Sequence, residues 1–240
     1  MPKLSWKYQK IMSIYKRDEK TKNFIIGQYS TPEIEYLKNN IWELTEKVDG
    51  TNIRVKYNGQ EAIYAGRSDE AHLPVSLIYK LDEIFKSEEG RKRLKETFDY
   101  ATEEMEVYLY GEGYGAKIQK GGGNYIKDGV DFVLFDVIVG HWQLERSNVD
   151  DIARKLNIKS VPVIGKGILN DAIEMVKEGF KSDWGNFTAE GIVARPPVEL
   201  FTKKGDRVIT KVKYADFHKS VREKQNEIIK DKRKFVAARF

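Results

Sequence analysis

The sequence predicts an α+β fold built of antiparallel sheets with flanking helices. Two observations predict it: short apolar or alternating stretches are separated by glycine turns, and helical periodicities stand between them in no regular strand–helix–strand order. The lack of that order argues against a doubly wound parallel sheet. With 240 residues and 40% hydrophobic content, the chain can bury a sizeable core, and we expect a single domain over residues 1–240.

Strand patterns are spread over most of the chain. In the first half, alternation of apolar and polar residues with turns at Gly50 and Gly59 predicts an antiparallel meander. Further on, the nearly continuous apolar run 132–139 is typical of a strand buried on both faces, and we place it at the centre of the core. The predicted strands are residues 41–46, 52–57, 61–65, 106–111, 132–139, 192–195 and 207–213.

Apolar residues at helical spacing predict the helices that flank these sheets. Residues 76–101 are interpreted as two consecutive amphipathic helices, and residues 148–156 and 171–180 as two shorter ones. The charge-rich segment 214–240 also has apolar residues at helical spacing between basic residues. We therefore expect a basic C-terminal helical tail over residues 214–240.

The composition excludes several classes of chemistry. The sequence has no cysteine, which excludes disulfides and cysteine nucleophiles, and its three histidines are too dispersed to suggest a zinc site. Its 42 Lys and Arg exceed its 37 Asp and Glu, and the resulting net charge of +5 fits a polyanionic partner. Because no stretch approaches the roughly 20 apolar residues of a membrane span, we expect a cytoplasmic protein without membrane contact, and a monomer.

Lys47 is the first candidate for chemistry. It stands at the end of a predicted strand in the segment TEKVDGTN (residues 45–52), where the glycine turn that follows would hold its amine on a rigid lip. Most lysines in such places are only solvated charges, and a Lys-x-Asp-Gly tetrad arises by chance in roughly 5% of chains of this size. The tetrad alone is therefore a moderate signal.

Further motifs follow this tetrad in a fixed order along the chain. They are GRS (66–68), GEG (111–113), FVLFD (132–136), EGIV (190–193) and KVK (211–213). Together with the tetrad, they resemble the collinear motifs of the covalent nucleotidyltransferases, the superfamily of ATP-dependent ligases and mRNA capping enzymes, and most closely the RNA ligase 2-like family. The resemblance covers residues from about 42 to 213.

The resemblance implies a fold and an activity. It implies an ATP-grasp-like nucleotidyltransferase domain, and an ATP-dependent RNA ligase that joins an RNA 5′-phosphate to a 3′-hydroxyl. Lys47 would be the catalytic nucleophile, carrying AMP as a lysyl-AMP intermediate before AMP passes to the RNA end. The partner would be RNA, as a nicked duplex or as paired ends, and the cofactors would be ATP and Mg²⁺, with Mn²⁺ as an alternative metal.

Positive charge is expected around the nucleophile. A lysine amine attacks only when it is neutral, and its ordinary pKa is about 10.4, so nearby positive charge or desolvation must lower the pKa of Lys47. Lys211 and Lys213 lie two apart on a predicted strand, so both side chains share one face and can bind one phosphate group, although an exposed strand face is the alternative. Arg67 is preferred to Arg54 as a further phosphate ligand, because it matches the arginine motif that follows the nucleophile in this family.

Two glutamates are candidate metal ligands. Glu112 and Glu190 each stand beside glycine at a predicted strand boundary, where a carboxylate can enter a pocket and bind magnesium. In isolation, each is more typical of a surface residue. The resemblance implies that Glu112 belongs to the motif that binds the ribose or the metal, and that Glu190 opens the motif that supports the metal-dependent steps.

The resemblance also implies how adenine is bound. The family stacks an aromatic side chain on the base, and Phe132 is the best match in a run where Phe132 and Leu134 share one strand face while Phe135 takes the other. A core position is the alternative for Phe132. The residue just before the nucleophile, Glu46, would read the exocyclic amine.

Two related activities and one unrelated function remain as alternatives. From residue 213 to residue 240 there are 27 positions, too few for the oligonucleotide-binding (OB) barrel that follows this domain in DNA ligases and capping enzymes, so we expect no downstream OB barrel. This expectation favours an RNA ligase over a DNA ligase catalytic domain or a capping-type guanylyltransferase. The third alternative is a non-catalytic basic RNA-binding module, which would form no covalent nucleotide adduct.

Overall fold

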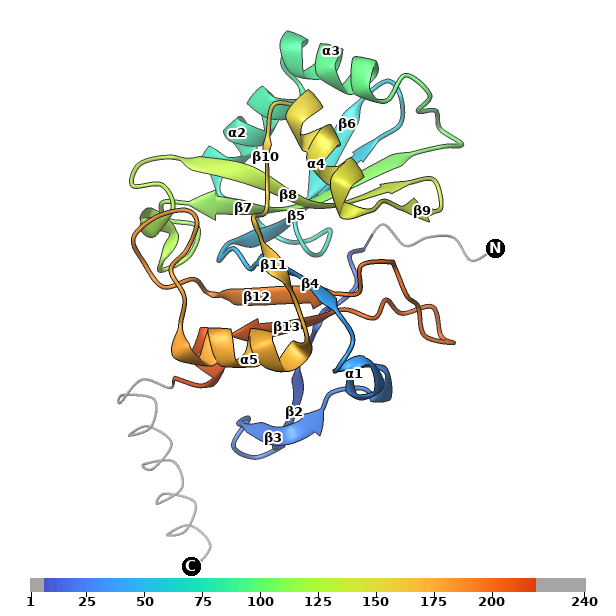
Figure 1. Ribbon diagram of the computed structural model, residues 1–240. Coiled ribbons are helices and arrows are strands. Elements are labelled where there is room, and N and C mark those ends of the chain that lie inside the picture. The colour runs from blue at the N-terminus through green and yellow to red at the C-terminus, as the bar shows by residue number, and fades with distance from the viewer. Residues whose placement is uncertain (1–6, 219–240) are drawn as a thin grey trace, which may run out of the picture.

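Two β-sheets face each other across the middle of the molecule, with helices on their outer sides (Figure 1). The computed structural model describes residues 7–218. One sheet has six strands and the other five, and most strand pairs in them are antiparallel. The predicted α+β fold of antiparallel sheets with flanking helices is confirmed.

The six-stranded sheet contains only part of the predicted meander: its second and third strands pair here as a hairpin, whereas the first, over residues 41–46, belongs to the five-stranded sheet. The strands of the six-stranded sheet are β5 (Thr51–Tyr57), β6 (Ala62–Ala65), β7 (Val107–Gly115), β8 (Val130–Val139), β9 (Trp142–Gln143) and β10 (Lys159–Ser160). The order across the sheet is β10-β8-β7-β5-β6, with β9 paired to β8. β5 and β7 pair in a register that sets Asn52 opposite Glu112, and nearly all of β8 is buried, as the continuous apolar run predicts.

The five-stranded sheet brings distant parts of the chain together. Its strands, in order across the sheet, are β1 (Met12–Ser13), β13 (Thr210–Lys213), β12 (Gly191–Arg195), β4 (Trp42–Glu46) and β11 (Val163–Gly167). β12 pairs antiparallel with both β4 and β13, whereas β1 runs parallel to β13. A separate hairpin consists of β2 (Tyr15–Arg17) and β3 (Phe24–Tyr29).

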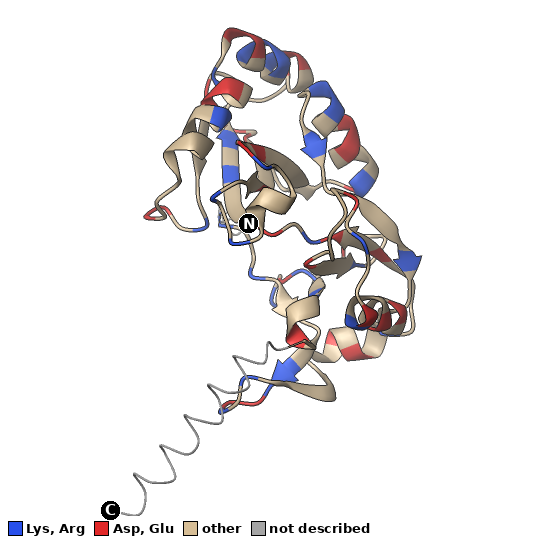
Figure 2. Cartoon of the chain, turned by 90° about the vertical axis from the view of Figure 1, so that its left-hand side faces the viewer, with Lys and Arg blue, Asp and Glu red and all other residues tan. Residues whose placement is uncertain are grey.

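Helices cover the outer face of each sheet (Figure 1). The six-stranded sheet carries α2 (Val75–Phe85), α3 (Glu88–Thr97) and α4 (Arg146–Lys155), and the five-stranded sheet carries α1 (Pro32–Leu37) and α5 (Leu169–Glu178). The apolar sides of these helices turn inward, so each sheet has its own hydrophobic cluster. On the outer sides of the helices, Lys and Arg are mixed with Asp and Glu (Figure 2), as expected for solvated faces.

The predicted elements from residue 41 onward correspond to observed strands and helices, with small shifts at their ends. The sequence did not indicate β1, β2, β3 and α1, which all precede residue 41, nor the short strands β9, β10 and β11. Of the predicted C-terminal tail, Tyr214–Asp216 form a 3₁₀ turn, and the part from residue 219 onward lies outside the described residues. Within residues 7–218, no helix has the length and apolar character needed to cross a membrane.

Candidate active site

A cavity of about 350 Å³ lies between the two sheets. Its walls come from the end of β4 and the turn after it, from β8, β12 and β13, and from the N-terminal segment before β1. A nucleotide-sized ligand fits this volume, because pockets for small molecules measure about 300–1,000 Å³. Of the predicted site residues, the lining contains Glu46, Lys47, Arg67, Glu112 and Lys211.

The turn between β4 and β5 places Lys47 at the edge of this cavity. The Lys47 N–H donates to the Gly191 carbonyl at 2.9 Å, which extends the pairing of β4 with β12 one residue past the end of β4. Gly50 lies directly against β7: a Cβ on it would stand 2.2 Å from the carbonyl oxygen of Gly113 and 2.7 Å from Cγ of Glu112. The turn can approach Glu112 this closely because residue 50 is glycine.

The Lys47 amine contacts a carboxylate that it shares with a second lysine. Nζ of Lys47 lies 2.7 Å from Oε2 of Glu190, and Nζ of Lys213 lies 2.5 Å from Oε1 of the same residue. Glu190 directly precedes β12, Lys213 ends β13, and the register of these strands sets Gly191 opposite Lys213. Strand pairing therefore brings Lys47, Glu190 and Lys213 to one point.

The charges around Lys47 raise its pKa rather than lower it. Burial alone would lower the pKa, but the carboxylates of Glu190 and Glu112 outweigh burial and hold the pKa of Lys47 above its ordinary value. The lowering expected from the sequence is absent from this arrangement, because the carboxylates of Glu190, Glu112 and Asp49 all favour the charged amine. Lys211 differs: burial, followed by the charges of Lys47 and Lys213, lowers the pKa of Lys211.

Glu112 and Glu190 offer oxygen ligands near the Lys47 amine. Burial raises the pKa of Glu112 to about 7, although the charge of Lys47 acts in the opposite direction. Burial and the carboxylates of Glu190 and Asp49 disfavour the ionised form of Glu112, and a divalent cation bound there would favour it. Over residues 7–218, no group of three or more His, Cys, Asp or Glu side chains could hold a metal ion. Two carboxylates still fit a magnesium ion whose other ligands are phosphate and water.

Phe132 lies in the hydrophobic core, and the prediction that it stacks on the base is wrong. Its side chain is 0% exposed and packs edge-on against Phe85 of α2, with 5.6 Å between the ring centroids. Gly111 on β7 lies against the same ring, since a Cβ there would come within 2.3 Å of two ring carbons. Phe135 lines the cavity instead. The alternation along β8 was predicted correctly, but the face that turns toward the cavity was not.

The N-terminal segment supplies a wall of the cavity that the sequence did not indicate. The ring of Tyr8 packs against Phe135 and Tyr110, with centroid distances of 5.1 and 5.0 Å. Gln9 joins the segment to the backbone of Arg207, accepting from its N–H at 2.7 Å and donating to its carbonyl at 3.2 Å. No motif or periodicity marks residues 7–11, so their role depends on tertiary contacts alone.

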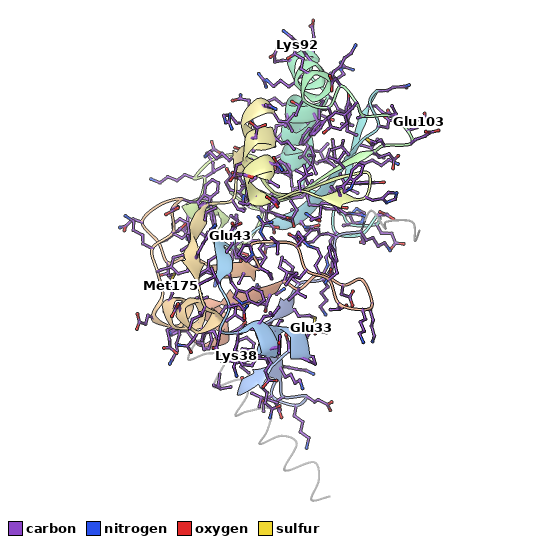
Figure 3. All side chains as sticks on the ribbon, turned by 45° about the vertical axis from the view of Figure 1, so that its right-hand side comes forward. Glu33, Lys38, Glu43, Lys92, Glu103 and Met175 are labelled. Carbon is purple, nitrogen blue, oxygen red and sulfur yellow. The ribbon has the colours of Figure 1, made fainter. Side chains whose placement is uncertain are left out.

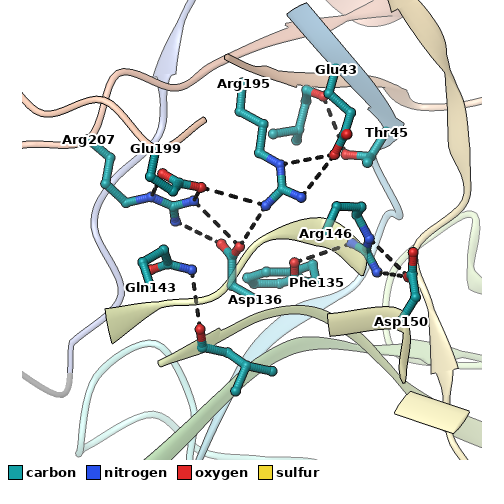
Figure 4. A network of polar contacts seen from close by, with 12 residues as sticks. Glu43, Thr45, Phe135, Asp136, Gln143, Arg146, Asp150, Arg195, Glu199 and Arg207 are labelled. Carbon is teal, nitrogen blue, oxygen red and sulfur yellow. Dashed lines mark hydrogen bonds and ion pairs between the residues drawn. The ribbon is translucent and has the colours of Figure 1, made fainter. Parts of the chain in front are cut away.

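A network of buried charges joins the two sheets beside the cavity (Figure 4). Asp136 of β8 accepts from Arg195 of β12 at 3.2 Å and from Arg207 at 2.8 Å. Arg195 also donates to Glu43 of β4 at 3.0 Å, and Arg207 donates to Glu199 at 2.7 Å. Glu43 is labelled near the middle of the molecule in Figure 3. Burial alone would raise the pKa of Asp136, but Arg207 and Arg195 outweigh burial and hold the pKa below its usual range.

A comparison of the sequence with protein families identifies the chain's relatives. The family model described as RNA ligase matches residues 40–213, which is more than half of the chain. This chain belongs to the RNA ligase family. The matched region begins just before β4 and ends with Lys213, so it contains every motif residue of the site.

Solved structures of Naegleria gruberi RNA ligase share the fold of this RNA ligase family member. The structure with PPi aligns with a TM-score of 0.58 at 23% sequence identity, over 78% of this chain and 54% of that one. A mutant of that ligase with ATP and Mn gives a TM-score of 0.56 at 21% identity, over 76% and 51% of the two chains. A mutant with AMP and Mn gives 0.58 at 21% identity, over 78% and 55%. This chain thus spans about half the length of those proteins.

Arg67 and Arg54, which the sequence offered as alternative phosphate ligands, have different surroundings in this RNA ligase family member. Arg67 lines the cavity. Arg54 is 0% exposed, and its guanidinium donates to the Gly66 carbonyl at 2.6 Å and pairs with Asp69 at 2.7 Å. Arg54 therefore fixes the loop that carries Arg67, and Arg67 is the arginine placed to reach a ligand.

Proposed function

We propose that this chain is an ATP-dependent RNA ligase that forms a covalent lysyl-AMP intermediate on Lys47. One observation supports this most: the Lys47 amine lies at the edge of a nucleotide-sized cavity, 2.7 Å from the Glu190 carboxylate, with Lys211 and Arg67 in the same lining. Nucleotidyl transfer needs such a set, since an amine acts as nucleophile while cationic side chains stabilise the phosphates. Membership of the RNA ligase family supports the same activity.

In the first step, the neutral Lys47 amine attacks the α-phosphate of ATP. A nitrogen–phosphorus bond forms, the bond between the α-phosphorus and the oxygen of the leaving group breaks, and pyrophosphate departs with the electron pair. Glu190, in contact with Nζ, is placed to accept the proton that the amine releases. Lys211 and Arg67 line the cavity and would bind the phosphates, and their positive charge favours the neutral form of the amine.

In the second and third steps, AMP passes to RNA and is then displaced. An oxygen of the RNA 5′-phosphate attacks the phosphorus of lysyl-AMP, and the amine of Lys47 leaves and regains its proton. A 3′-hydroxyl next attacks the 5′-phosphate, loses its proton, and AMP leaves as the strand is joined. The substrate is a nicked duplex or a pair of ends held by base pairing, because the two reacting groups must meet in one cavity.

Adenine and the metal have their own proposed ligands. Phe135 would stack on the base, replacing the role first expected of Phe132, and Glu46 would accept a hydrogen bond from the exocyclic amine. Glu112 and Glu190 would hold Mg²⁺, with Mn²⁺ as an alternative. The ion would supply positive charge that offsets the charge of the phosphates during transfer.

Self-labelling with ATP tests the proposal. Incubation with α-labelled ATP and Mg²⁺, without RNA, should label the protein through a bond that is stable to alkali and cleaved by acid, as expected of a phosphoramidate. Lys47→Ala should give no adduct. Lys47→Arg should also give none, because a guanidinium remains protonated and cannot act as the nucleophile.

Two further measurements complete this test. Lys203→Ala, which removes an exposed lysine from the 201–207 loop, should label like the unsubstituted protein and serves as the matched control. Sealing of matched nicked RNA and DNA duplexes distinguishes an RNA ligase from a DNA ligase. A labelled adduct in either Lys47 variant, or labelling with GTP in preference to ATP, would contradict the proposed activity.

A further inference from the structure

Both carboxylate oxygens of Glu46 accept hydrogen bonds from one loop, residues 181–188. Oε1 accepts from the Ser182 hydroxyl at 2.5 Å, and Oε2 accepts from the Asp183 N–H at 2.9 Å. Glu46 is 1% exposed and lines the cavity at the end of β4. These bonds therefore fix the orientation of a buried side chain that sits next to the nucleophile.

The hydroxyl of Ser182 has a defined direction. Its oxygen accepts from the Trp184 N–H at 3.1 Å, and Ser182 is 3% exposed, so its one proton is directed to Glu46. Both groups that face Glu46 are thus donors. They favour the ionised carboxylate, which can only accept, and leave no partner for a proton on either oxygen.

The loop that carries Ser182 is itself rigidly supported. It is closed by the bridge between Lys181 and Thr188, and the Ser182 N–H donates to the Phe187 carbonyl at 2.9 Å. Its Trp184 packs against Tyr114 of β7, with 4.9 Å between the ring centroids. These contacts fix the position of Ser182, so its hydroxyl can hold the Glu46 carboxylate in one orientation.

We propose that Ser182 is a positioning residue that, through Glu46, makes the site select adenine over guanine nucleotides. This inference rests on the proposed function, in which Glu46 faces the base. Adenine presents an exocyclic amine, which donates to a carboxylate held as an acceptor. Guanine presents a carbonyl oxygen at the same position, and two facing acceptors repel each other.

Removal of the Ser182 hydroxyl loosens this selection. Without its donor, Oε1 of Glu46 can turn or carry a proton, and a protonated Glu46 can donate to the guanine carbonyl. Burial raises the pKa of Glu46, while the bonds from Ser182 and Asp183 lower it, so the loss of one bond makes protonation easier. The selectivity for ATP over GTP should fall about tenfold, the scale of one hydrogen bond to a charged group.

The experiment compares ATP and GTP on the same preparation of each variant. Rates of self-labelling with each α-labelled nucleotide, and dissociation constants from calorimetry, give two ATP-to-GTP ratios that do not depend on the fraction of folded protein. Ser182→Ala should lower both ratios about tenfold. Ser182→Thr retains the hydroxyl and should keep them, and Thr188→Ala, at an exposed position of the same loop, is the matched control.

A double-mutant cycle decides whether Ser182 acts through Glu46. In the Glu46→Ala background, Ser182→Ala should change neither ratio further, because the group it positions is gone. The inference is overturned if Ser182→Ala keeps the original ratios, if Ser182→Thr loses them equally, or if the effect persists without Glu46. Absence of any adduct in the unsubstituted protein would defeat the proposed function instead, while the binding ratios would still decide the role of Ser182.

Discussion

Phe132 and Phe135 stand three positions apart on β8 and face opposite sides of the sheet. One ring packs under α2 against Phe85, and the other lines the cavity beside Tyr8. The two phenylalanines of this motif therefore have different roles: Phe132 packs in the core, and Phe135 lines the cavity. Substitution of each to alanine separates stability from binding.

Phe132→Ala should destabilise the fold by about 3–5 kcal/mol, since it leaves a cavity in a fully buried site. Phe135→Ala should leave stability nearly unchanged and weaken ATP binding several-fold, because it removes a stacking partner worth about 1 kcal/mol. Chemical denaturation and calorimetric titration with ATP measure the two effects. Equal losses of stability in both variants would contradict this division.

Glu112 gives the metal-free protein a pH-dependent stability. The pKa of Glu112 in the fold is raised to about 7 by burial, so its contribution is fully present below the ordinary carboxyl pKa and is lost as the pH rises through about 7. Glu112→Gln removes the charge and should therefore match the unsubstituted protein at pH 4 but exceed its melting temperature at pH 8. Thermal melts in the presence of a chelator check this. A Glu112→Gln variant that is less stable at pH 8 would oppose it.

The sequence could predict which motifs contain the site residues, but not which face of β8 turns toward the cavity. Period-two alternation separates Phe132 from Phe135, but which side meets α2 depends on the packing of Gly111 beneath one ring. The contact between Lys47 and Glu190 joins residues 143 positions apart, so its effect on the lysine pKa could not be inferred from spacing. The raised pKa of Lys47 is for this reason a property of the tertiary structure.

At the scale of elements, the turn between β4 and β5 is pressed against β7. Gly50 makes this contact possible, since any Cβ would overlap the Gly113 carbonyl and Cγ of Glu112. The glycine of the Lys-x-Asp-Gly tetrad is thus required for close packing as well as for the turn. One substitution should therefore disturb Lys47, the proposed nucleophile, and Glu112, a candidate metal ligand, together.

Gly50→Ala should reduce the rate of self-labelling by about tenfold or more, because a misplacement of about 1 Å between reacting groups slows transfer on that scale. Gly123→Ala is the matched control, because a Cβ there meets no atom within 4 Å. Rates of adduct formation, with circular dichroism as a check on folding, measure the effect. An unchanged rate in Gly50→Ala would show that the turn tolerates displacement.

The sequence did not predict β1 and β2 because their local signals are weak, although Thr31 and Pro32 do mark the start of α1. β1 has two residues and β2 has three, and Lys and Arg interrupt the apolar pattern of this region. β1 is stabilised by parallel pairing with β13, which sets Met12 opposite Thr210. A short strand stabilised by a partner so distant in sequence has no recognisable local pattern. The long apolar run of β8, in contrast, is recognisable from the sequence alone.

At the scale of the whole molecule, the two sheets are joined by the charges around Asp136. This carboxylate comes from the six-stranded sheet, while Arg195 and Glu43 come from the five-stranded one. Buried ion pairs offset their own desolvation only when every partner is present. The network therefore makes the relative position of the sheets, and with it the shape of the cavity, sensitive to single substitutions.

Asp136→Asn should destabilise the protein by about 3–5 kcal/mol, since it leaves Arg195 and Arg207 buried with less opposing charge. Because the pKa of Asp136 is lowered in the fold, its stabilisation is present above about pH 4 and is lost as the pH falls through the folded pKa. Urea denaturation at pH 7 and pH 3 measures both effects. Asp151→Asn, which breaks surface pairs on α4, should have a much smaller effect.

The two sheets also differ in how their strands are distributed along the chain. All strands of the six-stranded sheet lie within residues 51–160, whereas the five-stranded sheet needs β12 and β13 as well as β1. During synthesis from the N-terminus, the first sheet can complete its pairing while the second still lacks strands. Glu190, which contacts both Lys47 and Lys213, is synthesised after every strand of the six-stranded sheet. A nascent chain therefore contains Lys47 for 143 positions of synthesis before Glu190, its carboxylate partner, is added.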